Sequence, residues 1–196
     1  MSTTFWFDPS CPFTWRTSRW IRDTAARRGE TVRWRFLSLA ILNEGRDGVP
    51  ERFRTAHAAA LRALRVLAAA DEQHGQEAVD ALYTQLGARV HDRDEPLSSE
   101  TIAAAVAAAG LPAGLSAAAD DTAHDKAVRE SHDDAQARVG TESGSPVLAV
   151  GDGPAFFGPV LVPVPQGADA DRLLDALRLL SQVPQFSELK RGRNPL

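Results

Sequence analysis

The chain has 196 residues, of which 43% are hydrophobic and 24% are charged, so it can bury a core as an ordinary globular protein does. Its net charge of −4 and its scattered basic residues argue against a nucleic-acid partner, and no stretch approaches the roughly 18 apolar residues of a membrane span. The length favours one domain that carries a large insertion.

The N-terminal part predicts a strand, a helix and a second strand. Residues 3–7 form a short aromatic run, which suits a buried strand. Apolar spacing over residues 12–28 predicts a helix, with Ser10 available as its cap and Gly29 at its end. Residues 32–36 then alternate apolar and basic side chains, which is the period of a strand.

The middle of the chain, residues 43–140, shows almost no strand pattern. Its apolar spacing and turn residues predict a series of helices. These helices are expected from Pro50 onward and near residues 76–90, 98–109 and 121–139. We therefore expect a helical insertion subdomain at 43–140, flanked by one domain made of residues 1–42 and 141–196.

The C-terminal part predicts a hairpin and a helix. Residues 146–150 form a second β run, Gly151-Asp152-Gly153 can turn the chain, and residues 155–157 can return antiparallel. A helix is expected at residues 169–182. Strands on both sides of a helical block indicate an α/β fold.

Cys11 is the only cysteine, and it stands where the first strand gives way to the first helix. The N–H groups and positive end of a helix stabilise a thiolate, so this position predicts a lowered pKa and a reactive sulfur. A second thiol would have to come from another molecule, because one cysteine cannot form a disulfide within the chain. The alternative is an inert buried cysteine.

Other sequence features exclude some cofactors and suggest a cellular setting. The five histidines show no metal-ligand spacing and no glycine-rich nucleotide motif is present, so we expect neither a metal nor a nucleotide cofactor. All but two of the 22 basic residues are arginine, a bias that hints at an actinobacterial source. The N-terminus lacks a signal-peptide pattern and cysteine is scarce, which predicts a cytoplasmic protein.

Four motifs, read in chain order, resemble a known family. They are Phe5-Trp6-Phe7-Asp8-Pro9-x-Cys11-Pro12, Ser38-Leu39-Ala40-Ile41-Leu42-Asn43-Glu44, Phe156-Phe157-Gly158-Pro159-Val160-Leu161 and Glu188-Leu189-Lys190-Arg191. Together they are similar to the mycothiol-dependent nitroreductase branch of the DsbA-like family. The resemblance spans nearly the whole chain and implies a thioredoxin-like fold of the DsbA type with a large all-helical insertion.

The resemblance also implies that the protein is an oxidoreductase with mycothiol as its co-substrate, and that it forms a homodimer. Cys11, Pro12 and Thr14 correspond to its catalytic motif, but Phe13 replaces a tryptophan and Thr14 replaces the resolving cysteine. A cycle with one protein thiol remains, in which mycothiol regenerates Cys11 after a mixed disulfide or small electrophile has reacted. The Thr14 hydroxyl can donate a hydrogen bond to the sulfur.

Further residues are expected around the thiol. Pro146 should be cis and lie opposite Cys11, with the Ser145 backbone free to bind an extended thiol substrate. The aromatic Phe13 should be exposed beside the thiol, whereas Trp6, Trp15, Phe156 and Phe157 are expected in the core.

Three residues at and after the start of the insertion complete the expected site. Asn43 can bind substrate or cap a turn. Phe53 lies where the resemblance implies a tyrosine, which makes the pocket more apolar. His57, one helical turn further on, can reach the cleft or be a satisfied core histidine.

Two other functions remain open. One is a thiol transferase or isomerase similar to the kappa-class glutathione transferases, in which Thr14 or Ser10 polarises the sulfur of a bound cofactor and Cys11 is secondary. The other is a binding module without catalysis. In every case we expect small-molecule or mixed-disulfide ligands, and no nucleic acid or membrane.

Overall fold

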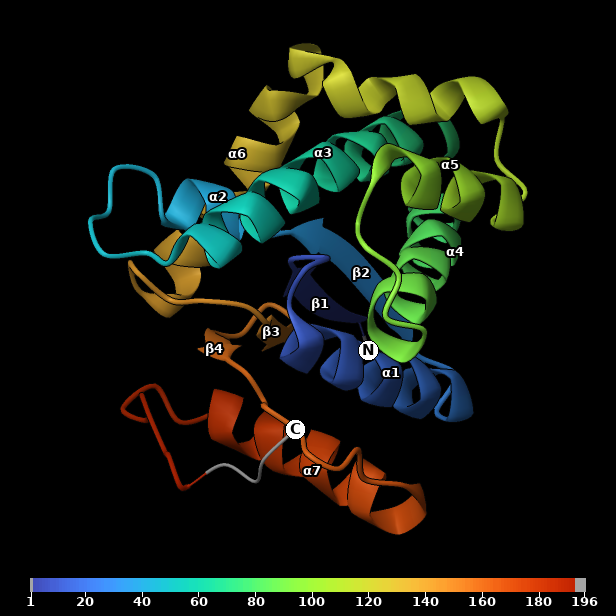
Figure 1. Ribbon diagram of the computed structural model, residues 1–196. Coiled ribbons are helices and arrows are strands. Elements are labelled where there is room, and N and C mark those ends of the chain that lie inside the picture. Colours follow the sequence, from blue (N-terminus) through green and yellow to red (C-terminus); the bar gives the residue numbers. More distant parts are fainter. Residues whose placement is uncertain (1, 193–196) are drawn as a thin grey trace.

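The computed structural model describes residues 2–192; Met1 and residues 193–196, the end of the predicted 141–196 segment, lie outside the described residues. Strands assemble into one sheet in the order β2-β1-β3-β4 (Figure 1). The strands are β1 (Ser2–Phe7), β2 (Thr31–Phe36), β3 (Val147–Val150) and β4 (Ala155–Phe157). β1 pairs parallel with β2 and antiparallel with β3, and β4 returns antiparallel to β3, which confirms the predicted hairpin.

Helices cover both faces of this sheet. On one face α1 (Pro12–Arg27) packs against α7 (Gly167–Ser181), and the indole N–H of Trp20 donates to the Ala170 carbonyl at 3.1 Å. On the other face lies α6 (Asp125–Val139), whose Ala135 packs against Trp6 of β1. The sheet is therefore the middle of three layers (Figure 1).

Side chains that alternate along the strands pack against the helices on both faces of the sheet. In β1, Phe5 and Phe7 point into the larger core shared with α1, whereas Trp6 points into the smaller core beneath α6. Leu148 of β3 joins Phe5 and Phe7, and its neighbour Val147 joins Trp6. The period-2 arrangement of a strand thus explains why the aromatic run of β1 is buried on both sides.

Between β2 and β3, residues 37–146 are all described and contain helices, turns and loops but no strand. The α-helices before α6 are α2 (Leu39–Leu42), α3 (Glu51–His74), α4 (Gln76–Gly87) and α5 (Ser99–Ala108). The short helices are the π-helical turn η1 (Ala88–Asp92) and two 3₁₀ helices, η2 (Ala113–Asp120) and η3 (Thr122–His124). The division into a domain and a helical subdomain stays a prediction. The larger hydrophobic core is continuous and includes residues from both parts.

The outer edge of β2 is covered by side chains of the helical segment. The Trp34 N–H donates to Gln76 Oε1 at 2.6 Å, and the amide of Gln76 returns a bond to the Trp34 carbonyl at 3.2 Å. Ser131 of α6 accepts the Phe36 N–H at 2.8 Å. These bonds satisfy backbone groups that an open sheet edge would leave free for pairing with another chain.

Two helix N-termini differ in how they are capped. Ser98 caps α5 by accepting the Thr101 N–H at 3.3 Å. The predicted Ser10 cap of α1 is wrong: Cys11 occupies the cap position without a side-chain bond, and the Ser10 hydroxyl instead bonds to Asp8 Oδ1 at 2.6 Å. The difference arises because α1 begins at Pro12, which leaves Ser10 one residue before the cap position, where its hydroxyl donates to the Asp8 carboxylate.

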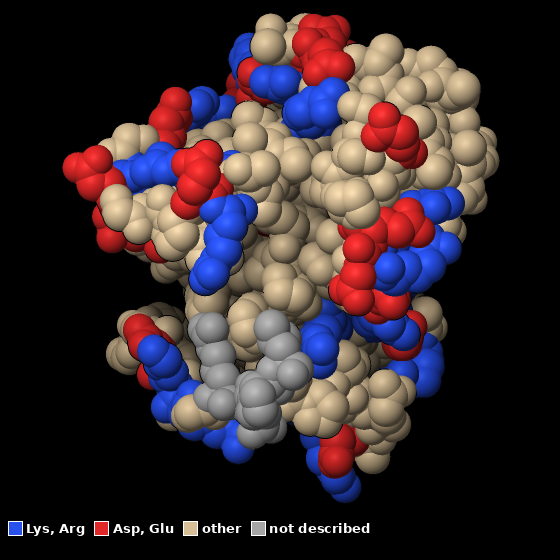
Figure 2. Space-filling model, viewed as in Figure 1, with Lys and Arg blue, Asp and Glu red and all other residues tan. Residues whose placement is uncertain are grey.

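Charge is mixed over the surface. Figure 2 shows basic and acidic side chains side by side on the face seen in Figure 1, around a hollow near its middle that is largely uncharged. Of the helices in the described part of the chain, none has the length and apolar character that crossing a membrane requires.

Trp15 joins the helical segment to α1. Its ring is 4% exposed and meets Tyr83 edge-on, with the ring centroids 5.8 Å apart. Its indole N–H donates to Asp92 Oδ1 at 2.9 Å. The ring lies so close to Gly87 that a β-carbon built there would fall 2.1 Å from Trp15 Cε3.

We expect Gly87→Ala to destabilise the protein by about 1–3 kcal/mol, because the new methyl group overlaps an indole that the core holds in place. Gly114→Ala is the matched control, since a β-carbon there meets nothing within 4 Å. Urea unfolding measures both free energies. Equal stability of the two variants would show that the Trp15 contact is not close packed.

Candidate functional site

Cys11 lies at the N-cap of α1, directly after the turn that follows β1. Its own N–H donates to the Asp8 carbonyl at 3.1 Å, and the Trp15 N–H donates to the Cys11 carbonyl at 3.1 Å. Its sulfur faces the Ser145-Pro146 peptide, which is cis as expected from the sequence, and Sγ lies 3.5 Å from the Ser145 carbonyl oxygen. The thiol and the loop before β3 therefore meet directly.

The predicted lowering of the Cys11 pKa is wrong for this structure. Only 8% of the residue is exposed, and burial raises the pKa of the Cys11 thiol because the thiolate loses its water. The Thr14 hydroxyl and the N–H groups of Thr14 and Phe13 oppose this rise in pKa, whereas the nearby Asp8 carboxylate adds to it. The helix end acts as predicted, but the cost of burial is larger.

Thr14 and Ser145 form a pair of buried hydroxyls beside the sulfur. Thr14 Oγ1 lies 2.7 Å from Ser145 Oγ, and Ser145 Oγ also accepts the N–H of Asp8 at 3.0 Å. Thr14 is fully buried and Ser145 is 7% exposed. Sequence reasoning proposed Thr14 as a donor to the sulfur and the Ser145 backbone as a binding group, but it missed the Ser145 hydroxyl.

Asp8 is a second group that sequence reasoning missed. Its fully buried carboxylate accepts the Ser10 N–H at 2.8 Å and the Leu39 N–H at 2.7 Å, in addition to the Ser10 hydroxyl. Burial raises the pKa of Asp8, and these hydrogen bonds oppose the rise. Asp8 thus ties the loop that carries Cys11 to the start of α2. An acidic residue at the end of a buried strand, just before the cysteine motif, is the signal that could have found it.

His91 reaches the same loop from the helical segment. The π-helical turn η1 places His91 Nε2 at 2.8 Å from the Pro9 carbonyl, two residues before Cys11. The imidazole also stacks on Trp15, with the ring centroids 6.3 Å apart. Burial lowers the pKa of His91, so the neutral ring is favoured. Sequence spacing gives no sign of this contact, because it depends on an irregular turn.

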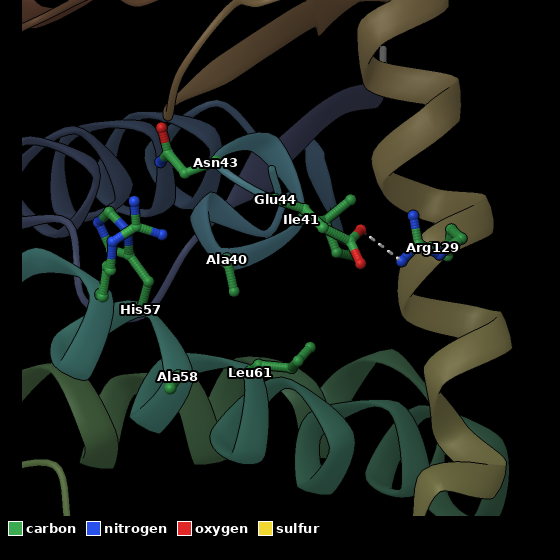
Figure 3. Close-up of a pocket in the computed structure, with 9 residues that line it drawn as sticks. Ala40, Ile41, Asn43, Glu44, His57, Ala58, Leu61 and Arg129 are labelled. Atoms are coloured by element: carbon green, nitrogen blue, oxygen red, sulfur yellow. Dashed lines mark hydrogen bonds and ion pairs between the residues drawn. The ribbon is translucent and has the colours of Figure 1, made fainter. Parts of the chain in front are cut away.

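A cavity of about 220 Å³ lies between α2, α3 and α6 (Figure 3). Asn43 and His57, both predicted to bind substrate, line it, together with apolar side chains such as Ile41 and Leu61. At one side Arg129 pairs with Glu44 at 3.1 Å. Cys11 does not line this cavity. The two are linked through Asp8, which holds the Leu39 N–H at the start of α2 and lies within electrostatic reach of His57.

Two polar side chains of this cavity, Asn43 and His57, differ in whether their hydrogen-bonding groups are already paired within the protein. Asn43 Nδ2 donates to the Leu39 carbonyl at 2.8 Å, so this side chain also caps α2. His57 Nδ1 is buried without a hydrogen-bond partner among the described residues. Phe53 is 44% exposed and stacks on His57, with ring centroids 6.1 Å apart, but it does not line the cavity. His57 therefore has the stronger case for contacting a ligand.

The aromatic predictions are confirmed in part. Trp6 and Trp15 are buried, at 1% and 4% exposed. Phe157 was expected in the core but is 43% exposed, and its ring lies near Gly144, beside the Ser145-Pro146 loop. Phe157 is the last residue of β4, the short strand at the edge of the sheet. Phe13, which was expected to be exposed, and Phe156, which was expected in the core, are both half-buried.

Within the part of the chain that the structure describes, no group of three or more histidine, cysteine, aspartate or glutamate side chains could hold a metal ion. The site itself supplies one thiol, Cys11, with the Thr14 hydroxyl and the N–H groups of Phe13 and Thr14 around it.

The sheet order, the helical segment between β2 and β3 and the cysteine at the start of α1 define a DsbA-type thioredoxin fold. Solved structures share it. The cytosolic disulfide reductase DsbM of Pseudomonas aeruginosa matches with a TM-score of 0.61 and 18% identity, over 91% of this chain and 100% of that one. A 2-hydroxychromene-2-carboxylate isomerase matches with a TM-score of 0.64 and 17% identity, over 93% and 96% of the two chains.

The profile of the family described as mycothiol-dependent nitroreductase Rv2466c matches residues 10–191. The chain belongs to this family, which confirms the resemblance seen in its motifs. A relative is the "Uncharacterized protein Rv2286c" of Mycobacterium tuberculosis (strain ATCC 25618 / H37Rv), 34% identical over 97% of this chain and 82% of that protein.

The raised pKa of Cys11 gives a direct prediction. At pH 7 the sulfur should be a thiol, and its alkylation by iodoacetamide should accelerate with pH without a plateau below about pH 8.5, the pKa of an ordinary cysteine. Mass spectrometry of the intact protein follows the single alkylation. A plateau at or below pH 7.5 would contradict control by burial and restore the expectation of an acidic sulfur.

Proposed function

We propose that this protein is a one-thiol oxidoreductase in which Cys11 exchanges with a low-molecular-weight thiol, mycothiol. The observation that carries the proposal is the contact of Cys11 Sγ with the Ser145 carbonyl, 3.5 Å away, beside the Thr14 hydroxyl. Membership of a family described as mycothiol-dependent supports the choice of thiol. One neighbour in structure, DsbM, has also been solved with GSH and matches with a TM-score of 0.61.

The reaction cycle has two exchange steps. First, the Cys11 thiolate attacks the mycothiol sulfur of a mixed disulfide; a Cys11–mycothiol disulfide forms, and the substrate leaves as a thiolate that takes up a proton. Second, the thiolate of another mycothiol attacks the mycothiol sulfur of this adduct, which releases mycothiol disulfide and restores the Cys11 thiolate. In the net reaction the substrate is released as a free thiol, and the mycothiol group of the mixed disulfide joins one free mycothiol in mycothiol disulfide.

This chain's own groups act on the sulfur of Cys11 during both steps. The Thr14 hydroxyl and the N–H groups of Phe13 and Thr14 stabilise the negative charge when Cys11 is the leaving group. The Ser145 carbonyl accepts the S–H proton of the resting thiol. Thr14 cannot attack the mixed disulfide as a second cysteine would, so the adduct has to wait for a thiol from solution.

The cavity between α2, α3 and α6 is the proposed binding place for the small or extended part of a substrate. Its lining is mainly apolar, with His57 Nδ1 open to a hydrogen bond from a ligand. The Asn43 side chain also lines the cavity, and Phe53, which stacks on His57, adds apolar surface beside it. Phe13, which follows the Cys11-Pro12 pair, is proposed to add apolar surface beside the thiol. We further propose a cytoplasmic setting in an actinobacterium, which the family and the mycobacterial relative support.

Incubation with mycothiol disulfide tests the proposed function. We expect one mycothiol adduct per chain, which Cys11→Ser abolishes and added mycothiol removes. Thr14→Ser is the matched control, because it keeps the hydroxyl and should still form the adduct. Wild-type protein that takes up no adduct between pH 7 and pH 9, although folded, would contradict the proposal.

A second function is supported by a specific observation, the burial of Cys11. In a thiol transferase or isomerase the reactive sulfur belongs to the bound cofactor, and a raised pKa at Cys11 is then harmless. Thr14 or Ser10 would polarise that sulfur.

Cys11→Ser also separates the two functions. It should abolish reduction of a mycothiol mixed disulfide if Cys11 is the nucleophile. Turnover that survives this substitution within about threefold would favour the transferase, since a residue outside the chemistry alters the rate little. The readout is release of free thiol from the mixed disulfide, with wild-type protein as reference.

A further inference from the structure

The Ser145 hydroxyl lies close to the site but has no role in the two proposed exchange steps. Its oxygen accepts the Asp8 N–H at 3.0 Å and lies 2.7 Å from Thr14 Oγ1. The same residue's carbonyl oxygen lies 3.5 Å from Cys11 Sγ. Ser145, in the loop before β3, therefore contacts both the Cys11 sulfur and the Thr14 hydroxyl beside it.

Counting protons restricts how these groups can bond. Each hydroxyl has one proton to donate. If Thr14 donates to Ser145 Oγ, it has none left for the sulfur. Because Ser145 Oγ already accepts the Asp8 N–H, its own proton is free to point at Thr14 Oγ1. Only in this second arrangement does the Thr14 proton face Cys11.

The state of the sulfur selects between the two arrangements. A thiol can donate its S–H to the Ser145 carbonyl and needs no donor from Thr14. A thiolate has no proton to donate and attracts the Thr14 proton instead. The backbone N–H of Asp8 cannot turn away, since β1 and the following turn fix it, so it holds the Ser145 oxygen ready for the second arrangement.

We propose that Ser145 is a positioning residue: held by the Asp8 N–H, its hydroxyl donates to Thr14 Oγ1 and thereby directs the Thr14 proton onto the Cys11 sulfur. The pair of hydroxyls takes over, in this chain, the space beside the sulfur where the family motif has a second thiol. The inference rests on the proposed use of Cys11 as a nucleophile and extends it to a residue from the loop before β3.

A double-mutant cycle on thiol reactivity tests the proposal. The variants are Ser145→Ala, Thr14→Val and both together, and the measurement is the pH profile of Cys11 alkylation by iodoacetamide. Ser145→Ala should slow alkylation at pH 7 roughly three- to tenfold, by leaving Thr14 undirected. In the Thr14→Val background the same substitution should have no further effect, because the Ser145 hydroxyl acts on the sulfur through Thr14 and the Ser145 carbonyl is unchanged by the substitution.

Matched controls separate positioning from loss of structure. Ser131 is a buried serine that also accepts a backbone N–H, that of Phe36, so Ser131→Ala should cost comparable stability and leave the alkylation profile unchanged. Ser145→Thr keeps the hydroxyl and should restore alkylation. Urea unfolding reports whether each variant is folded.

Two results would overturn the proposal: an unchanged profile in Ser145→Ala, or an effect of equal size in the Thr14→Val background. If Ser145→Ala does not fold, Thr14→Val decides, and normal alkylation of that variant would overturn the proposal. Alkylation involves no mycothiol, so a failure of the proposed function appears only in the adduct experiment and is distinguishable from a failure here.

Discussion

The site depends on the antiparallel pairing of β1 with β3. Trp6 lies opposite Val147 in this ladder, so continuing the register by two residues brings Asp8 opposite Ser145. The Asp8 N–H then reaches the Ser145 hydroxyl, and Cys11, three residues further on, meets the Ser145 carbonyl. A shift of this register by one residue would point every side chain of the strand to the other face and separate the sulfur from both hydroxyls.

Burial and reactivity oppose one another at this sulfur. The packing that fixes Thr14 and Ser145 beside the sulfur also excludes water from it. The thiolate therefore loses its hydration at the place where its hydrogen-bond donors are most ordered. The donors gain strength from the low dielectric surroundings. Unlike an exposed cysteine at a helix N-terminus, Cys11 therefore depends on the hydrogen bonds of Thr14 and Phe13 to form a thiolate.

The helical segment contributes to the site from two directions. Through Asp92 it contacts Trp15 of α1, and through His91 it contacts the loop before Cys11. Through α2 and α3 it forms the neighbouring cavity, where His57 and Asn43 lie (Figure 3). The loop carrying the cysteine is therefore held between the sheet and the helices, and Asp8 is bonded to both.

Patterns along the chain were enough to predict the strands, the main helices, the hairpin at Gly151 and the cysteine at the strand-to-helix junction, because these follow from local periodicity and turn chemistry. They also singled out Asn43 and His57 as candidate site residues, and the cavity that these two line is not lined by Cys11. The pKa of Cys11, the roles of Asp8 and the Ser145 hydroxyl, and the contact of His91 with Pro9 were decided only by tertiary structure. Desolvation and hydrogen bonds between residues more than 80 positions apart depend on how strands pair and helices dock, which a local pattern does not contain.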